Sequence, residues 1–211
     1  MFENPETGAL ENFDFEQLQK QVPELQKFPI SIDSYQFNPP IDSSDMNPDA
    51  WRKIVKVVSD NYDRYTGFVV LHGTDTMAYT ASAVTFMLPG LDKSVVFTGS
   101  QLPLTAELSD GPDNLRTAFA MAASGHPGVY VAFDRKVMLG CRAVKVRASN
   151  FAAFESVNAR YVGQVSSHGL VIDPGVLPVQ TGKPRLMETV SQTVFLLKLT
   201  PGLSPQIFHA L

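Results

Sequence analysis

The chain has 211 residues, of which 44% are hydrophobic, with 17 basic and 21 acidic side chains and a formal net charge of −4. This acidic balance gives no positive field for binding nucleic acid, and no apolar run reaches the roughly 18 residues that a membrane-spanning helix needs. The first residues lack the basic and apolar regions of a signal peptide, and Cys141 is the only cysteine, so no disulfide can form within the chain. We therefore expect a cytoplasmic protein with no nucleic-acid partner and no membrane association.

Helical and strand patterns alternate along the first two thirds of the chain. Residues 46–65 carry apolar side chains at spacings of three and four behind Asn47-Pro48, which predicts an amphipathic helix with its N-cap at this dipeptide. The runs 67–71 (GFVVL) and 94–97 (SVVF) are short, apolar and without alternation, as in strands buried on both faces of a parallel sheet. The remaining predicted elements are helices at 75–88 and 110–123 and a β-hairpin of 129–133 and 136–139, joined at Asp134-Arg135. This alternation predicts an α/β fold layered around a largely parallel sheet.

The composition changes after residue 170. Residues 171–192 contain three prolines and two glycines, which predicts a linker. Residues 193–199 (TVFLLKL) have the composition of a strand, and 201–211 that of the start of a helix. Because one βα unit cannot bury its own faces, we expect three parts: an α/β domain over 1–170, a linker over 171–192 and the incomplete start of a second, smaller α/β domain over 193–211.

Polar residues follow two of the predicted strands. Thr74, Asp75 and Thr76 come just after 67–71, and the turn Thr98-Gly99-Ser100-Gln101 closes the next strand. The carboxyl ends of parallel strands meet at one edge of a sheet, which is where open sheets bind ligands. The alternative for the first turn is that Thr74 or Asp75 only caps the following helix, and for the second that it is an ordinary polar loop.

Three further features are candidates for chemistry. The turn Asp42-Ser43-Ser44-Asp45 could hydrogen-bond a small polar ligand, although generic turns have the same composition. Lys145 lies among small and apolar residues, so its ammonium is either partly desolvated and poised for proton transfer or solvated like most lysines. His72, at a strand end, is expected to be a satisfied core histidine. The other histidines are dispersed and the sequence has no P-loop, GxGxxG or GxSxG, so metal, nucleotide and Ser-His-Asp chemistry lack support.

Residues 67–77, GFVVLHGTDTM, resemble the signature of the bacterial L-asparaginases, with His-Gly-Thr-Asp-Thr intact. Other segments match the family in the same order along nearly the whole chain: IDSSDM at 41–46, TGSQLP at 98–103, SDG at 109–111 and GCRAVK at 140–145. IDSSDM and TGSQLP are similar to the cytoplasmic type I branch of the family rather than to the periplasmic type II branch.

The resemblance implies a three-layer α/β domain that hydrolyses the side-chain amide of L-asparagine to L-aspartate and ammonia. The family does so through an acyl-enzyme on a threonine, without a metal or an organic cofactor. Thr74, Asp75 and Lys145 would form a triad in which lysine and aspartate tune the hydroxyl and help to activate water. The amino-acid head of the substrate would be held by Asp42, Ser43, Ser44, Thr74 and Asp75. Family members are homodimers or homotetramers.

The sequence departs from the family at a motif that carries a nucleophile. The glycine-rich turn Thr-Gly-Gly-Thr-Ile-Gly, whose second threonine is a key nucleophile, has no counterpart here, and Thr7-Gly8 follows Asn4-Pro5 and is interpreted as a turn. We therefore expect a domain that lacks its first strand, a chain truncated at both ends, and little or no asparagine hydrolysis by the chain as written. Two other interpretations stay open: a degenerate amino-acid-binding module that retains the pocket of Ser43, Ser44 and Asp75, and the amidase subunit of a tRNA-dependent amidotransferase.

Overall fold

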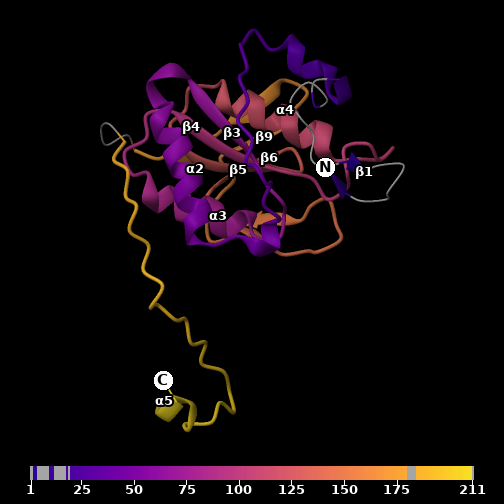
Figure 1. The fold of residues 1–211 in the computed structure, drawn as a ribbon. Helices are drawn as coiled ribbons and strands as arrows, with labels where there is room; N and C mark the ends of the chain where they lie inside the picture. The colour runs from indigo at the N-terminus through magenta and orange to yellow at the C-terminus, as the bar shows by residue number, and fades with distance from the viewer. Residues whose placement is uncertain (1, 4–9, 12–17, 19, 180–183, 211) are drawn as a thin grey trace.

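The computed structural model describes residues 2–3, 10–11, 18, 20–179 and 184–210 (Figure 1). The turn predicted at Thr7-Gly8 and residues 180–183 of the predicted linker lie outside the described residues. Two short strands near the N-terminus, β1 (Phe2–Glu3) and β2 (Leu10–Glu11), pair antiparallel with each other.

A six-stranded sheet lies at the centre of the molecule, in the order β10-β9-β6-β5-β4-β3. Its strands are β3 (Gly67–Leu71), β4 (Ser94–Thr98), β5 (Gly128–Phe133), β6 (Lys136–Leu139), β9 (Gly163–Ser166) and β10 (Gly169–Ile172). Strands β3, β4 and β5 are parallel neighbours, and each later pairing is antiparallel, so β9 again points the same way as β5. Four of the six strands therefore share one direction, in agreement with the predicted α/β class.

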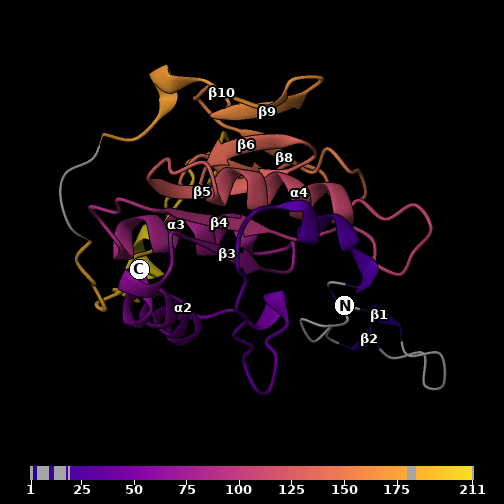
Figure 2. The ribbon, with the colours of Figure 1, turned by 90° about the horizontal axis from the view of Figure 1, so that it is seen from above.

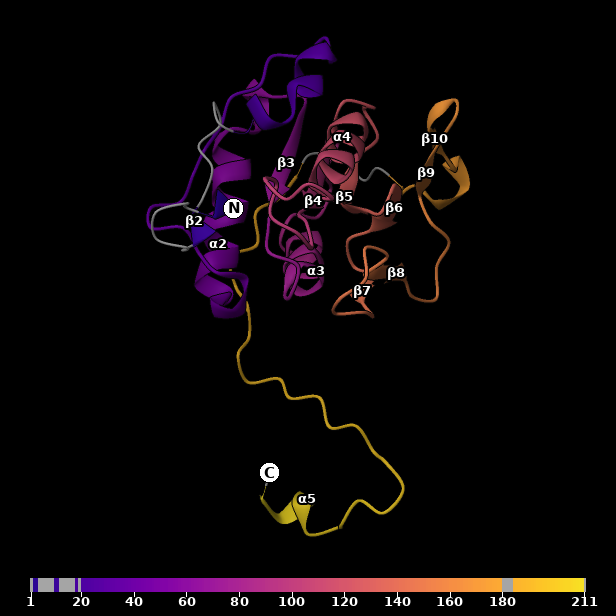
Figure 3. The same ribbon diagram turned by 90° about the vertical axis from the view of Figure 1, so that its right-hand side faces the viewer.

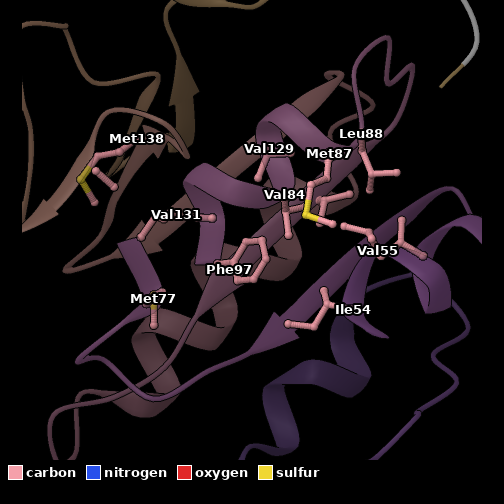
Figure 4. Close-up of a cluster of buried hydrophobic side chains, with 14 of the residues drawn as sticks. Ile54, Val55, Met77, Val84, Met87, Leu88, Phe97, Val129, Val131 and Met138 are labelled. Atoms are coloured by element: carbon pink, nitrogen blue, oxygen red, sulfur yellow. The ribbon is translucent and has the colours of Figure 1, made fainter. Parts of the chain in front are cut away.

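Helices cover both faces of this sheet. The three long ones are α2 (Pro48–Asp60), α3 (Met77–Met87) and α4 (Gly111–Ala122). Figure 3 shows α4 on one side of the sheet and α3 on the other. Alternate residues of β4 follow this division: Val95 and Phe97 pack with α2 and α3, whereas Val96 packs with α4. Figure 4 shows the larger of these two cores, and the three-layer architecture is confirmed.

Two local predictions are confirmed in detail. Helix α2 begins at Pro48, and the Asn47 side chain caps it by accepting hydrogen bonds from the backbone N–H groups of Asp49 and Ala50 at 3.0 and 3.1 Å. Strands β5 and β6 form the predicted hairpin, in which Asp134 and Arg135 both have positive φ, at 50° and 60°. Positive φ at both central residues is typical of the two-residue hairpin turn whose backbone twist matches the right-handed twist of the flanking strands.

Strand β3 differs from the expectation in its burial. Leu71 is 54% exposed and the rest of β3 is half-buried, whereas every residue of β4 is buried. Strand β3 stands last in the order of the sheet, so one of its edges has no partner strand among the described residues. An apolar run without alternation therefore predicted the strand correctly but not its position at the edge.

Smaller elements complete the fold. A two-stranded ribbon of β7 (Ala143–Lys145) and β8 (Phe154–Ser156) adds Ala143 and Phe154 to the larger core. Leu18, Val22 and Leu25, the last in η1 (Pro23–Lys27), pack against residues of α4. Figure 2 shows the N-terminal part of the chain passing beside α4. The remaining short helical turns are η2 (Ser43–Asp45), η3 (Tyr62–Arg64), η4 (Pro174–Val176) and α5 (Ile207–Ala210).

The chain after β10 has two different parts. The backbone N–H groups of Arg185 and Met187 donate to the carbonyls of Pro89 and Met87 at 3.0 and 2.9 Å, and Leu186 and Val190 pack against the larger core. Residues 193–199 do not form the predicted strand: Val194, Phe195 and Leu196 are 82%, 70% and 88% exposed, and the segment runs away from the body (Figure 1). A strand needs a partner edge, and this segment has none among the described residues.

No helix in the part of the chain that the structure describes is long and apolar enough to cross a membrane.

Candidate active site

A threonine, a lysine and an aspartate meet at the carboxyl end of β3. Lys145 Nζ lies 2.8 Å from Thr74 Oγ1 and 2.8 Å from Asp75 Oδ1, although 70 residues separate Asp75 from Lys145 in the sequence. The Lys145 side chain is only 17% exposed, while that of Asp75 is 67% exposed, so the ammonium is largely shielded and the carboxylate reaches into water. The structure therefore brings together the three residues of the predicted triad, and of the two alternatives left open for Lys145 it shows the largely shielded one. We call them the Thr74–Asp75–Lys145 cluster.

Two glycines allow the turns around this cluster to pack closely. A Cβ at Gly73 would lie 2.4 Å from Ser43 Oγ, and a Cβ at Gly99 would lie 2.2 Å from the carbonyl oxygen of His72, so neither position has room for a side chain. The His72 N–H donates to the Thr98 carbonyl at 2.8 Å and continues the β3–β4 pairing. The turns after β3 and β4 therefore lie side by side, as expected for the ends of parallel strands.

Gln101, in the turn after β4, contacts Thr74 directly. The Thr74 hydroxyl donates to Gln101 Oε1 at 3.0 Å, so Thr74 Oγ1 donates to the glutamine and accepts from Lys145. The Gln101 side-chain amide donates to the carbonyls of Ala148 and Asn150 at 2.8 and 3.2 Å. The sequence placed this turn at the correct edge of the sheet, but it held no signal that Gln101 binds the threonine.

Two side chains at the start of α4 hold the Gln101 turn in place. The Asp110 carboxylate accepts hydrogen bonds from the backbone N–H groups of Gln101, at 2.9 and 3.0 Å, and of Leu102, at 3.1 Å. The buried Asn114 donates to Asp110 at 2.9 Å and to the Gly99 carbonyl at 3.0 Å. A fully bonded polar network of this kind fixes the backbone, so the start of α4 fixes the backbone from which Gln101 reaches Thr74.

The predicted ligand-binding turn at 42–45 packs against the turn after β3. It forms η2, in which the Asp42 carboxylate accepts hydrogen bonds from the hydroxyl and the N–H of Ser44, at 2.6 and 2.8 Å, and these bonds lower the pKa of Asp42. Ser43 is buried against Gly73. All the predicted site residues thus lie at one edge of the sheet. Within the described residues, however, no hydrogen bond joins the side chains of this turn to the Thr74–Asp75–Lys145 cluster.

The hydroxyls after β3 do not serve as helix caps. The N-cap residue of α3 is Thr76, and its side chain makes no capping hydrogen bond. Thr74 donates to Gln101, and Thr76 donates to the carbonyl of Ser43 at 2.6 Å. The alternative that Thr74 or Asp75 only caps the helix is therefore wrong.

His72 is only partly satisfied. Its Nδ1 donates to the Gly73 carbonyl at 2.7 Å, while its Nε2 is buried and has no hydrogen-bond partner in the described parts of the chain. Burial lowers the pKa of His72, so the ring is neutral at physiological pH. The expectation of a fully satisfied core histidine is therefore wrong for one of the two ring nitrogens.

The chemistry that this arrangement can perform follows from its groups. A hydroxyl beside an amine can pass its proton to that amine, and a carboxylate beside the amine keeps it in place. The Thr74–Asp75–Lys145 cluster is therefore suited to activating an oxygen nucleophile. Across the described residues, no three His, Cys, Asp or Glu side chains lie close enough together to hold a metal ion.

The chain is similar to known proteins along most of its length. The Asparaginase, N-terminal family matches residues 1–174. The chain is 41% identical over 170 residues to the L-asparaginase of Thermococcus kodakarensis, which covers 81% of this chain and 52% of that protein. It is 38% identical over 187 residues to L-asparaginase 1 of Escherichia coli K12, which covers 88% of this chain and 54% of that protein.

A solved L-asparaginase structure and an amidotransferase subunit also match the chain. The thermostable L-asparaginase from Thermococcus kodakarensis superposes with a TM-score of 0.89 at 35% identity, covering 97% of this chain and 62% of that one. A glutamyl-tRNA(Gln) amidotransferase subunit of the same organism is 33% identical over 219 residues, covering 97% of this chain and 49% of that protein. The chain spans about half the length of the curated relatives that it matches. Since the family match extends over most of its residues, the chain belongs to the asparaginase family.

Proposed function

We propose that this chain carries the nucleophile-activating part of an amidohydrolase site whose substrate is L-asparagine. The reaction converts L-asparagine and water into L-aspartate and ammonia. The observation that carries the proposal is the 2.8 Å contact between Lys145 Nζ and Thr74 Oγ1, made between segments 71 residues apart. A hydroxyl is a weak nucleophile until a neighbouring base takes its proton, and Lys145 is the group within reach.

In the proposed mechanism a threonine oxygen attacks the amide carbon of the substrate. This forms an ester and expels ammonia, which takes up the proton that the threonine lost. Water then cleaves the ester, which releases aspartate and restores the hydroxyl. Lys145 takes protons from Thr74 and returns them, while Asp75 holds the lysine in place.

The amino-acid head of the substrate is proposed to bind between two turns. It carries an ammonium, which needs a carboxylate partner, and a carboxylate, which needs neutral hydrogen-bond donors. The exposed carboxylate of Asp75 supplies the first, and the hydroxyls of Ser43 and Ser44, in the turn that begins at Asp42, are proposed to supply the second. Ser44 is exposed, and its hydroxyl, which donates to Asp42 at 2.6 Å, would have to turn from Asp42 to the substrate carboxylate on binding.

We also propose that no metal or organic cofactor takes part, that the protein acts in the cytoplasm, and that it functions as a homodimer or homotetramer.

A direct assay tests the function. The purified 211-residue protein should release ammonia from L-asparagine far more slowly than the roughly 1 to 1,000 turnovers per second of ordinary enzymes, because its sequence lacks the Thr-Gly-Gly-Thr-Ile-Gly motif. A version with the family's first strand and this motif placed before residue 1 should gain turnover and lose it again on Lys145→Met. Ordinary turnover by the 211-residue protein would refute its predicted inactivity. Failure of the extended version to turn over would favour a binding module.

Calorimetry with L-aspartate tests the site independently of turnover. Saturable binding should be lost in Thr74→Val and in Asp75→Asn. It should persist in Thr85→Val, a matched control whose hydroxyl donates to the Ala81 carbonyl within α3. If the unchanged protein bound no aspartate, the substrate assignment would be overturned.

The second candidate is the amidase component of a tRNA-dependent amidotransferase. The amidotransferase relative from Thermococcus kodakarensis covers nearly all of this chain, which favours it, whereas the net charge of −4 gives no surface field for RNA. Salt-sensitive binding of tRNA, together with release of ammonia from L-glutamine by the extended version, would favour this candidate over an asparaginase.

A further inference from the structure

Thr76 joins two segments that the proposed function needs in one place. Its hydroxyl donates to the carbonyl oxygen of Ser43 at 2.6 Å, across 33 residues of sequence. Thr76 lies in the turn that carries Thr74 and Asp75, and Ser43 lies in η2, the turn proposed to hold the head of the substrate. Among the described residues this is the only side-chain hydrogen bond that connects the two turns.

The contact leaves little freedom to either turn. Ser43 is 8% exposed, although both of its neighbours are exposed, because it is pressed against Gly73. The carbonyl that Thr76 binds also accepts from the Met46 N–H at 3.3 Å, the hydrogen bond that closes η2. Thr76 therefore holds this turn through its backbone, while the side chains of Asp42 and Ser44, which bond to each other, stay on its exposed side.

The Thr76 hydroxyl does not cap its own helix. A threonine at an N-cap position usually accepts a hydrogen bond from an N–H in the first turn of its own helix. Thr76 occupies that position in α3 but makes no such bond, and its hydroxyl faces the Ser43 carbonyl instead. Donation to Ser43 would still allow the oxygen to accept a capping bond, so the missing cap shows that the hydroxyl points toward the turn at 42–45 and not toward its own helix.

We propose that Thr76 is a positioning residue that sets the place of the turn at 42–45 relative to the Thr74–Asp75–Lys145 cluster. The affinity of the site for a small amino acid depends on this placement. The inference rests on the proposed function, because it requires one ligand to touch both turns. Thr76 acts through the Ser43 carbonyl and not by contact with the reacting amide.

The physical reason is the short span of the ligand. Aspartate has few rotatable bonds, so it cannot stretch to follow a turn that moves. A displacement of about 1 Å between the two turns breaks either the contacts of the amino-acid head or those of the side chain. The hydroxyl of Thr76 prevents that displacement.

Three variants test the proposal in the 211-residue protein. Thr76→Val removes the hydroxyl and keeps the shape, Thr76→Ser keeps the hydroxyl, and Thr85→Val removes a hydroxyl of the same helix that bonds only within α3. The affinity for L-aspartate, measured by calorimetry, should fall about tenfold or more in Thr76→Val. It should stay within about twofold in the other two variants. Thr76→Ala serves the same purpose where Thr76→Val does not fold.

Amide hydrogen exchange gives a readout that needs no ligand. The N–H groups of Ser44 and Met46 should exchange faster in Thr76→Val than in Thr85→Val, even if the two variants have the same melting temperature. Unchanged exchange in Thr76→Val, or unchanged aspartate affinity, would overturn the proposal. A wild-type protein that bound no aspartate would overturn the proposed function, and the exchange data would still show whether Thr76 holds the turn.

Discussion

At Gly73, the absence of a side chain allows the two turns of the candidate site to touch. A Cβ at this position would lie 2.4 Å from Ser43 Oγ and 2.6 Å from Ser43 Cβ. We expect Gly73→Ala to lower the free energy of unfolding by about 1–3 kcal/mol, as overpacking does elsewhere. Urea unfolding measures this loss.

A second change shows whether this overlap is the cause. Ser43→Gly removes both of the atoms that the new methyl group would meet, so the double variant should recover much of the stability that Gly73→Ala loses. Residues in contact give non-additive free energies in such a cycle, whereas independent sites add. Strict additivity of the two changes would show that Gly73 is needed for another reason.

His72 should make stability depend on pH near neutrality. Burial lowers its pKa, so below about pH 6.5 the unfolded chain binds a proton that the folded chain does not. The stability from the neutral buried ring is therefore complete above pH 6.5 and is lost as the pH falls, by at most about 1.4 kcal/mol per pH unit.

Urea unfolding at pH 7, 6 and 5 tests this dependence. His72→Gln should flatten the decline in the free energy of unfolding, while His168→Gln, which changes an exposed histidine, should leave it as it is. An equal slope in the His72 variant would mean that other groups dominate in this range.

The candidate site could be predicted from the sequence only in part. The ends of β3 and β4 were placed together because parallel strands share an edge, and Lys145 was a candidate because its neighbours are apolar. The hydrogen bonds of Thr74 to Gln101 and of Thr76 to Ser43 had no local signal, since each depends on how separate loops pack. Hydroxyls beside a helix start predict capping, and here tertiary contacts replace it.

At the scale of elements, the turn between β5 and β6 holds a backbone conformation that a substitution should relax. Arg135 has a φ of 60°, a left-handed conformation that costs a residue with a Cβ free energy and costs glycine much less. Arg135→Gly should therefore raise the free energy of unfolding by up to about 1 kcal/mol, and the melting temperature by about 2 °C. Arg135→Ala keeps the Cβ and should give no gain. A gain in both variants would point to the lost charge as the cause.

The order of the elements was predictable, and their places in the sheet were less so. Helices α2, α3 and α4 and the β5–β6 hairpin lie where the periodicity and turn residues put them. The sequence did not predict the edge position of β3, because an apolar run is buried only where neighbouring strands and helices cover it. The prediction of a strand at 193–199 failed for a related reason: residues of strand-like composition form a strand only where they can pair with the edge of another strand.

At the scale of the whole molecule, the described chain consists of a packed three-layer body and a tail with few contacts. The layers meet in two cores that share the sheet, and the site lies at one end of that sheet, where the ends of β3, β4 and β7 meet. Residues 185–190 still belong to the body, because they bond to the end of α3 and pack on the larger core. Residues 193–199 are mostly exposed and extend away from it (Figure 3).

Two shortened chains should separate these parts. A chain that ends at Gln192 loses a segment whose described side chains are exposed or lightly packed, so its melting temperature should stay within about 1 °C of the original. A chain that ends at Val179 also loses the packing of Leu186 and Val190 and two backbone hydrogen bonds. It should lose about 2 kcal/mol, which lowers the melting temperature by about 4–8 °C. Calorimetry measures the melting temperatures of the original chain and of the two shortened chains. An equal fall in both shortened chains would mean that the tail itself stabilises the body, since its removal alone would then account for the whole effect.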